Sequence, residues 1–194
     1  MCGIVAAVAD RNIVPILLEG LRKLEYRGYD SAGLALINGS GLHRLRAVGR
    51  VVELTAQAEE TAANGRIGIA HTRWATHGVP CERNAHPHIS AGLVVVHNGI
   101  IENHEALRAR LKAEGYEFTS ETDTEVVAHL VASELKKTSD FFSAARAAIA
   151  QLQGAYALAI VREAEPGRVI VAREGSPLLL GLGENGNYAA SDAS

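Results

Sequence analysis

Cysteine is scarce in this chain, with only Cys2 and Cys81 among 194 residues. Two cysteines cannot build a disulfide framework, so we expect a reducing compartment and a cytoplasmic protein. Positive charge is not in excess either, because 19 lysine and arginine residues stand against 22 acidic ones. This balance predicts neither nucleic acid nor an anionic membrane as a partner.

Long apolar runs are also missing. No stretch approaches the roughly 20 residues that a membrane-spanning helix needs, and the first residues do not resemble a signal peptide. The glycine-rich stretch 175–186 contains no GxGxxG or Walker sequence, so we assign it no phosphate-binding role. Hydrophobic residues still make up 47% of the chain, which is enough for the core of one domain spanning 1–194.

The spacing of apolar residues predicts strands toward both ends of the chain and helices in the middle. Strands are expected at 2–8, 34–37, 42–48, 67–70, 93–96, 156–161, 169–172 and 178–182. Helices are expected at 13–24, 51–60, around 107–111, at 122–131 and at 140–152. This order favours an α+β fold over a parallel doubly wound sheet.

An irregular stretch at 72–92 separates two of the predicted strands and holds the only tryptophan. Loops of this length inside a domain are usually functional. Cys81, His86 and His88 suggest a metal site or a non-catalytic metal-binding module, but they lack the paired spacing of zinc sites. We therefore predict that these are polar core or loop histidines, and that no metal is bound.

Cys2 is the first candidate for chemistry, because it directly follows the initiator methionine. Removal of Met1 would leave a cysteine with a free α-amine, whose pKa of about 8 lets it act as a general base for the thiol. Nucleophile and base would then belong to one residue. The alternative is a small buried thiol at the start of a strand.

Three later segments offer partners for such a nucleophile. Arg73 follows a predicted strand and either grips a carboxylate or forms a surface salt bridge. Asn98 and Gly99 either donate two hydrogen bonds to an oxyanion or form an Asn-Gly turn. Asp123 lies in the capping-box pattern 122–125, in the expected first turn of a helix, where it either binds an ammonium group or simply caps the helix.

Together, these segments resemble the glutaminase domain of the glutamine–fructose-6-phosphate aminotransferase family, within the class II N-terminal-nucleophile amidotransferases. The blocks that carry the resemblance are 2–5, 24–33, 71–78, 84–88, 96–103 and 120–125. Residues 26–30, Trp74 and 100–103 favour this aminosugar branch over the amidophosphoribosyltransferase branch. That branch remains an alternative, as does an N-terminal-nucleophile amide hydrolase with another substrate.

The resemblance implies a four-layer αββα sandwich of two stacked antiparallel sheets, removal of Met1, and no cofactor. It implies that Cys2 attacks the side-chain amide of L-glutamine, releases ammonia and passes through a γ-glutamyl thioester. It further implies that Asn98 and Gly99 form the oxyanion hole. By the same resemblance Arg73 binds the α-carboxylate and Asp123 the α-ammonium, while Thr76, His77, Trp74 and Arg27 lie at the same pocket.

The family also has a C-terminal sugar-phosphate isomerase part that acts on fructose 6-phosphate, and no block of this chain matches it. We expect the chain to end short of the family's usual glutaminase domain boundary. The resemblance thus implies glutaminase chemistry by this chain, without synthesis of glucosamine 6-phosphate.

Overall fold

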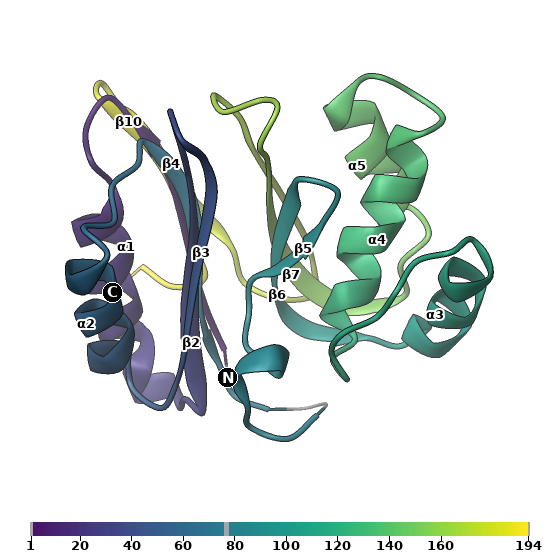
Figure 1. Cartoon of the computed structure of the whole chain (residues 1–194), viewed down its shortest axis with the longest axis horizontal. Helices are drawn as coiled ribbons and strands as arrows, with labels where there is room; N and C mark the ends of the chain where they lie inside the picture. The colour runs from purple at the N-terminus through teal and green to yellow at the C-terminus, as the bar shows by residue number, and fades with distance from the viewer. Residues whose placement is uncertain (1, 76–77, 194) are drawn as a thin grey trace.

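The computed structural model describes residues 2–75 and 78–193, which form four layers (Figure 1). Two antiparallel sheets face each other in the middle. Helices α1 (Val14–Leu24) and α2 (Val51–Glu60) cover one outer face, and α3 (His104–Ala113), α4 (Thr124–Leu135) and α5 (Phe141–Ile149) lie on the opposite side. The predicted αββα sandwich is confirmed.

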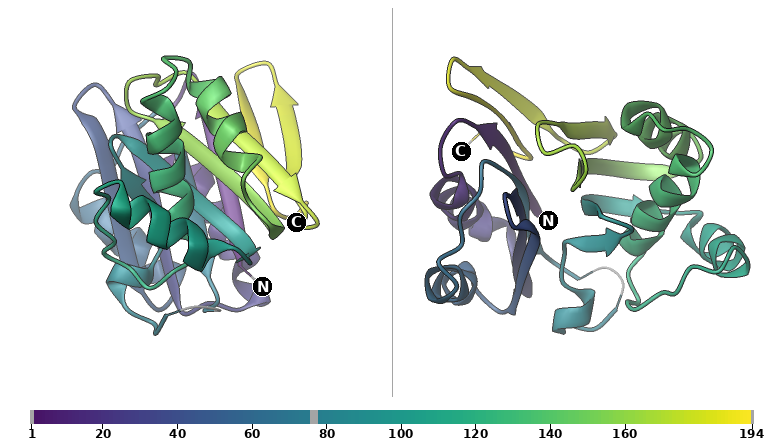
Figure 2. Two further views of the ribbon diagram at one scale, coloured as in Figure 1. Left: turned by 90° about the vertical axis from the view of Figure 1, so that its right-hand side faces the viewer. Right: turned by 45° about the horizontal axis from the view of Figure 1, so that its top comes forward.

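The larger sheet has six strands in the order β3-β2-β4-β1-β10-β9. Its strands are β1 (Gly3–Ala9), β2 (Ser31–Asn38), β3 (Gly41–Val48), β4 (Ile67–Arg73), β9 (Leu179–Gly183) and β10 (Gly186–Ala190). The smaller sheet has the order β5-β6-β7-β8, with β5 (His88–Ser90), β6 (Leu93–Ile101), β7 (Gly154–Arg162) and β8 (Val169–Glu174). In both views of Figure 2 the β9–β10 hairpin, in yellow, lies at one edge of the molecule.

Alternation of side chains along the strands fills three separate cores. In β1, Ile4 points into the apolar layer between the sheets, whereas Val5 packs toward the α1 and α2 layer. In β6, Val94 and Val96 face the other sheet, while Val95 packs with the helices on the far side. Because both faces of these strands are buried, a register slip of one residue would exchange every side chain between two cores.

Each predicted helix and strand has a counterpart in the structure, although several bounds differ; for example, the strand predicted at 67–70 continues to Arg73, and the helix predicted at 122–131 is Thr124–Leu135. The short strands β5 and β10 were not predicted, and the predicted strand 93–96 continues to Ile101. His97, Asn98 and Gly99 are therefore paired with Leu158, Ala157 and Tyr156 in the middle of the smaller sheet. The interpretation of Asn98-Gly99 as a turn is wrong, because β7 supplies a pairing partner that local sequence does not reveal.

The start of α4 differs from the predicted capping box. Asp123, rather than Thr122, is the N-cap residue, and its side chain makes no capping hydrogen bond. Glu125 instead reaches back to the preceding loop, where its carboxylate accepts hydrogen bonds from Thr119 N (2.9 Å), Ser120 N (2.7 Å) and both hydroxyls. Glu125 therefore fixes the segment that leads into Asp123.

These contacts predict a pH-dependent contribution of Glu125 to stability. Burial alone would raise its pKa, but nearby His129 (3.7 Å) and the hydrogen bonds from Ser120 and Thr119 hold the pKa well below its usual range. A lowered folded-state pKa adds stability above the unfolded value of about 4.3, and this is lost as the pH falls. We expect Glu125→Gln to lower the free energy of unfolding by about 1–3 kcal/mol at pH 7.

Urea denaturation of wild type and variant at pH 7 and pH 3.5 would measure this difference, which should shrink at the lower pH. Glu60→Gln, at the exposed end of α2, is the matched control and should change stability by less than about 0.5 kcal/mol. An equal loss for Glu125→Gln at both pH values would contradict the assignment.

Candidate active site

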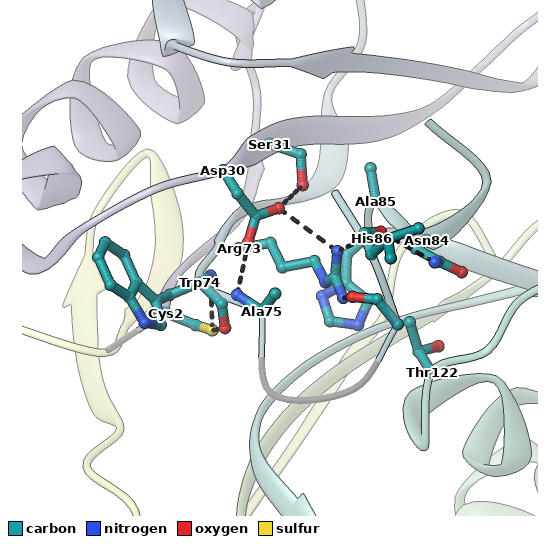
Figure 3. Close-up of polar contacts among 12 residues, drawn as sticks. Cys2, Asp30, Ser31, Arg73, Trp74, Ala75, Asn84, Ala85, His86 and Thr122 are labelled. Atoms are coloured by element: carbon teal, nitrogen blue, oxygen red, sulfur yellow. Dashed lines mark hydrogen bonds and ion pairs between the residues drawn. The ribbon is translucent and has the colours of Figure 1, made fainter. Parts of the chain in front are cut away.

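The antiparallel register of β1 and β4 brings the first candidate residues together. Gly3 lies opposite Thr72, so Cys2 lies beside Arg73 and Trp74 where β4 ends (Figure 3). The second sheet and the start of α4 close the site from the other side. One cavity is lined by Cys2, Arg73, Trp74, His86, His97, Gly99, Thr122, Asp123 and Thr124.

The Cys2 thiol is tied to the backbone of Trp74. Its Sγ accepts a hydrogen bond from Trp74 N (3.2 Å) and donates one to Trp74 O (3.5 Å). Burial raises the pKa of Cys2, and Asp30 adds to this, whereas the Trp74 N–H and the charge of Arg73 lower the pKa and do not offset burial. The thiol form therefore dominates at neutral pH, and a nucleophilic role for Cys2 requires a base.

Asn98 and Gly99, which lie within β6, are also next to Cys2. Asn98 is buried, and its Nδ2 donates a hydrogen bond to Cys2 O (3.1 Å). Gly99 has φ +118°, and a Cβ there would lie 2.0 Å from Ala155 O, so only glycine fits this backbone. An amide donor and a side-chain-free backbone position thus lie next to Cys2.

Arg73 is buried rather than part of a surface salt bridge, so that interpretation is wrong. Its side chain is 4% exposed and pairs with Asp30 Oδ1 at 3.4 Å (Figure 3). Arg73 Nη2 also donates to Gly78 O at 2.7 Å. The same Asp30 carboxylate accepts hydrogen bonds from Ala75 N and from the Ser31 hydroxyl. Sequence reasoning did not single out Asp30, although it lies inside the block 26–30 that carried the resemblance.

Asp123 is a buried carboxylate whose side chain does not cap α4. Its Oδ2 accepts a hydrogen bond from Ile101 N (2.8 Å), and His97 Nδ1 lies 3.9 Å from the same oxygen. Arg73 and Asp123 thus place one cation and one anion on the walls of a single cavity. Such a pair of charges can bind a zwitterion at both ends.

Of the other predicted residues, the structure describes Trp74 and Arg27. The Trp74 side chain is 53% exposed and lies against Gly28, where a Cβ would come within 2.1 Å of the indole. Arg27 donates to Ser191 O (3.2 Å) and pairs with Asp192 (3.8 Å), and it is not among the described residues that line the cavity. Thr76 and His77 lie outside the described residues.

The histidines suggested as metal ligands are engaged with threonines. His86 Nε2 lies 2.7 Å from Thr124 Oγ1, and His88 Nε2 lies 2.9 Å from Thr122 Oγ1. Within residues 2–75 and 78–193, no group of three or more His, Cys, Asp or Glu side chains is arranged to hold a metal ion. The helices within these same residues are all too short or too polar to cross a membrane.

Comparison with known proteins adds independent findings. Glutamine–fructose-6-phosphate aminotransferases (isomerizing) from Pseudomonas syringae pv. tomato and Escherichia coli K12 are each 59% identical to this chain over 99% of its length. The chain spans about a third (32%) of the length of these relatives.

Solved structures show the same fold. The Bacillus subtilis glutamine phosphoribosylpyrophosphate amidotransferase, complexed with ADP and GMP, superposes with a TM-score of 0.83 at 28% identity, over 98% of this chain and 42% of that one. A glutamine aminotransferase class-II domain protein from Silicibacter pomeroyi shares the fold with a TM-score of 0.66 at 18% identity, over 97% and 88% of the two chains.

The glutamine amidotransferase domain family matches residues 71–194, which is more than half of the chain. This segment contains Arg73, Asn98, Gly99 and Asp123, while Cys2 joins them through the pairing of β1 with β4. The match, the full-length similarity to the aminotransferases and the fold agree with one another. The chain therefore belongs to the glutamine amidotransferase domain family.

Proposed function

We propose that this chain is a glutaminase that hydrolyses L-glutamine to glutamate and ammonia through a γ-glutamyl thioester on Cys2. The observation that carries the proposal is the convergence of a thiol, a guanidinium and a carboxylate on one cavity, with Asn98 bonded to Cys2. A thiol alone would suit many amide hydrolases. The opposite charges of Arg73 and Asp123 select an amide whose other end is an amino acid.

The first chemical step needs a base, since the pKa of Cys2 is raised by burial. After removal of Met1, the α-amine of Cys2 takes the thiol proton and the thiolate attacks the side-chain carbonyl carbon of glutamine. The new C–S bond turns the carbonyl oxygen into an oxyanion. The NH₂ group of Asn98 and the backbone N–H of Gly99 donate hydrogen bonds to it.

Collapse of this intermediate breaks the C–N bond. The protonated α-amine returns its proton to the departing nitrogen, which leaves as ammonia, and the γ-glutamyl thioester remains. A water molecule then gives a proton to the same amine and attacks the thioester carbonyl. The C–S bond then breaks, the protonated amine returns its proton to the sulfur, and glutamate leaves with the Cys2 thiol restored.

Substrate recognition requires exchange of partners at Arg73. In the ligand-free site its guanidinium bonds to Gly78 O and pairs with Asp30. The α-carboxylate of glutamine would replace the Gly78 carbonyl, while Asp123 would receive the α-ammonium group. We further propose that Thr76, His77, Trp74 and Arg27 line or cover the bound substrate, as the family resemblance implies.

The larger reaction is proposed from the relatives. Because the 59% identical proteins are glutamine–fructose-6-phosphate aminotransferases, we infer that the ammonia serves formation of glucosamine 6-phosphate from fructose 6-phosphate in a sugar-phosphate isomerase part. The 28% identity with the phosphoribosyl enzyme makes that branch the weaker candidate. Both cysteines are free, which fits action in the reducing cytoplasm.

Labelling with a diazo-ketone analogue of glutamine tests the nucleophile. Peptide mapping should find the adduct on Cys2, and intact mass should show that Met1 is absent from active preparations. Cys2→Ser should abolish labelling, and Cys81→Ser should leave it unchanged. An adduct on another residue would contradict the assignment of Cys2 as the nucleophile. Full activity with Met1 retained would show that another group acts as the base.

Kinetics of charge-removing variants test the binding roles. Loss of a buried charge-assisted contact costs about 1.5–3 kcal/mol, so Arg73→Ala and Asp123→Asn should each raise KM for glutamine about 10- to 150-fold. Arg83→Ala removes an exposed arginine that pairs with Glu121, and it should leave KM unchanged. An Arg73→Ala enzyme with wild-type KM and unchanged preference for glutamine over simple amides would favour a different amide hydrolase.

A further inference from the structure

The side-chain amide of Asn98 is held at both ends. Its Nδ2 donates to Cys2 O at 3.1 Å, and its Oδ1 lies 3.0 Å from His71 Nε2. His71 Nε2 also lies 2.8 Å from the backbone oxygen of His97. Both oxygens can only accept hydrogen bonds, so His71 Nε2 must carry the proton. A rotated Asn98 amide would turn its oxygen toward Cys2 O and its NH₂ toward the His71 donor.

The proton on His71 Nε2 sets the state of the next ring. His71 is fully buried, and this burial together with the nearby His97 lowers its pKa to about 3, so the ring is neutral and Nδ1 is an acceptor. His86 Nδ1 lies 2.9 Å from His71 Nδ1 and 3.2 Å from His71 Nε2, with the two rings edge to face at 85°. Because His71 Nε2 directs its own proton at the oxygens of His97 and Asn98, Nδ1 is the acceptor of the pair. An N–H is the group that suits this contact, so the proton of neutral His86 is on Nδ1.

Thr124 continues the chain of hydrogen bonds. Its Oγ1 lies 2.7 Å from His86 Nε2 and 2.9 Å from His97 Nδ1. Burial lowers the pKa of His86 well below its usual range, so His86 Nε2 is an acceptor and receives the hydroxyl proton. The hydroxyl has only one proton to give, and His97 Nδ1 must therefore donate to Thr124.

We propose that His71, His86 and Thr124 are positioning residues that fix the Asn98 amide with its NH₂ group toward Cys2. The donors run in one direction from His97 through Thr124, His86 and His71 to Asn98. This inference deepens the proposed function, because it rests on Asn98 as an oxyanion donor. It also links that donor to the start of α4, where Thr124 follows Asp123 in the sequence.

A merely space-filling role for these histidines makes a different prediction. Packing alone would tolerate either tautomer, and an apolar side chain of similar size would leave the amide of Asn98 in place. Positioning requires a proton at His71 Nε2 and an acceptor at His86 Nε2. The two explanations therefore differ in tautomers and in whether effects at His71 pass through Asn98.

Nitrogen-15 NMR of the histidines in the intact chain tests the order of donors directly. At pH 7 we expect the Nε2–H tautomer for His71 and the Nδ1–H tautomer for both His86 and His97. Thr124→Val should change the His86 signals and shift the side-chain amide signals of Asn98. The Nδ1–H tautomer at His71, or unchanged Asn98 signals in His71→Leu, would overturn the proposal.

Measurements of kcat and KM for His71 and Asn98 variants test whether His71 acts through Asn98. His71→Leu should lower kcat for glutamine about 10- to 100-fold with little change in KM, and His71→Gln, which keeps a donor, should recover part of it. In an Asn98→Ala background, His71→Leu should cause no further loss. His43→Leu removes a histidine that bonds to Ser40 Oγ and does not line the described cavity, and it should leave kcat unchanged.

Fully additive losses of His71→Leu and Asn98→Ala would contradict the positioning role. Failure of the wild-type chain to hydrolyse glutamine, or to be labelled on Cys2, would instead remove the proposed function. The NMR measurements do not depend on activity, so in that case they alone decide whether His71 fixes the orientation of the Asn98 amide.

Discussion

The register between β1 and β4 is the constraint on which the site depends. Gly3 lies opposite Thr72, and this pairing puts the Cys2 thiol within hydrogen-bond reach of the Trp74 backbone. The register is not set at the site itself. It is set by Ile4 and Val5, which point into two different cores that a slip of one residue would exchange. Hydrophobic packing on both faces of the sheet thus positions the Cys2 thiol.

Backbone groups satisfy the buried charges that surround Cys2. Arg73 bonds to Gly78 O and pairs with Asp30, and Asp123 accepts a hydrogen bond from Ile101 N. A buried ion without such partners would cost several kcal/mol. Gly78 O and Ile101 N–H are neutral dipoles, so under the proposed function the carboxylate and ammonium groups of glutamine would compete with them.

Local sequence predicted the parts of the fold that depend on local spacing. The helix at α1 and the hairpin of β2 and β3 follow from apolar periodicity and from an Asn-Gly-Ser-Gly turn. Asn98-Gly99 was ambiguous, because its pairing with β7 depends on residues more than fifty positions away. Asp30 was missed for the same reason, since only the folded chain brings it to Arg73. Residue types in the sequence indicated Cys2, Arg73 and Asp123, but the sequence pattern could not show which residues contact them in the folded chain.

The choice of histidine in the buried network has a physical reason. A neutral imidazole carries one donor and one acceptor on opposite sides of a rigid ring, so a proton fixed at one nitrogen determines the role of the other. At His71 the two carbonyl oxygens of His97 and Asn98 fix that proton, and the rings of His71 and His86 extend the order toward Thr124. A hydroxyl can rotate, and an apolar side chain carries no direction. Burial keeps the imidazoles of His71 and His86 neutral. Because they are neutral, this series of hydrogen bonds holds the Asn98 amide in one orientation.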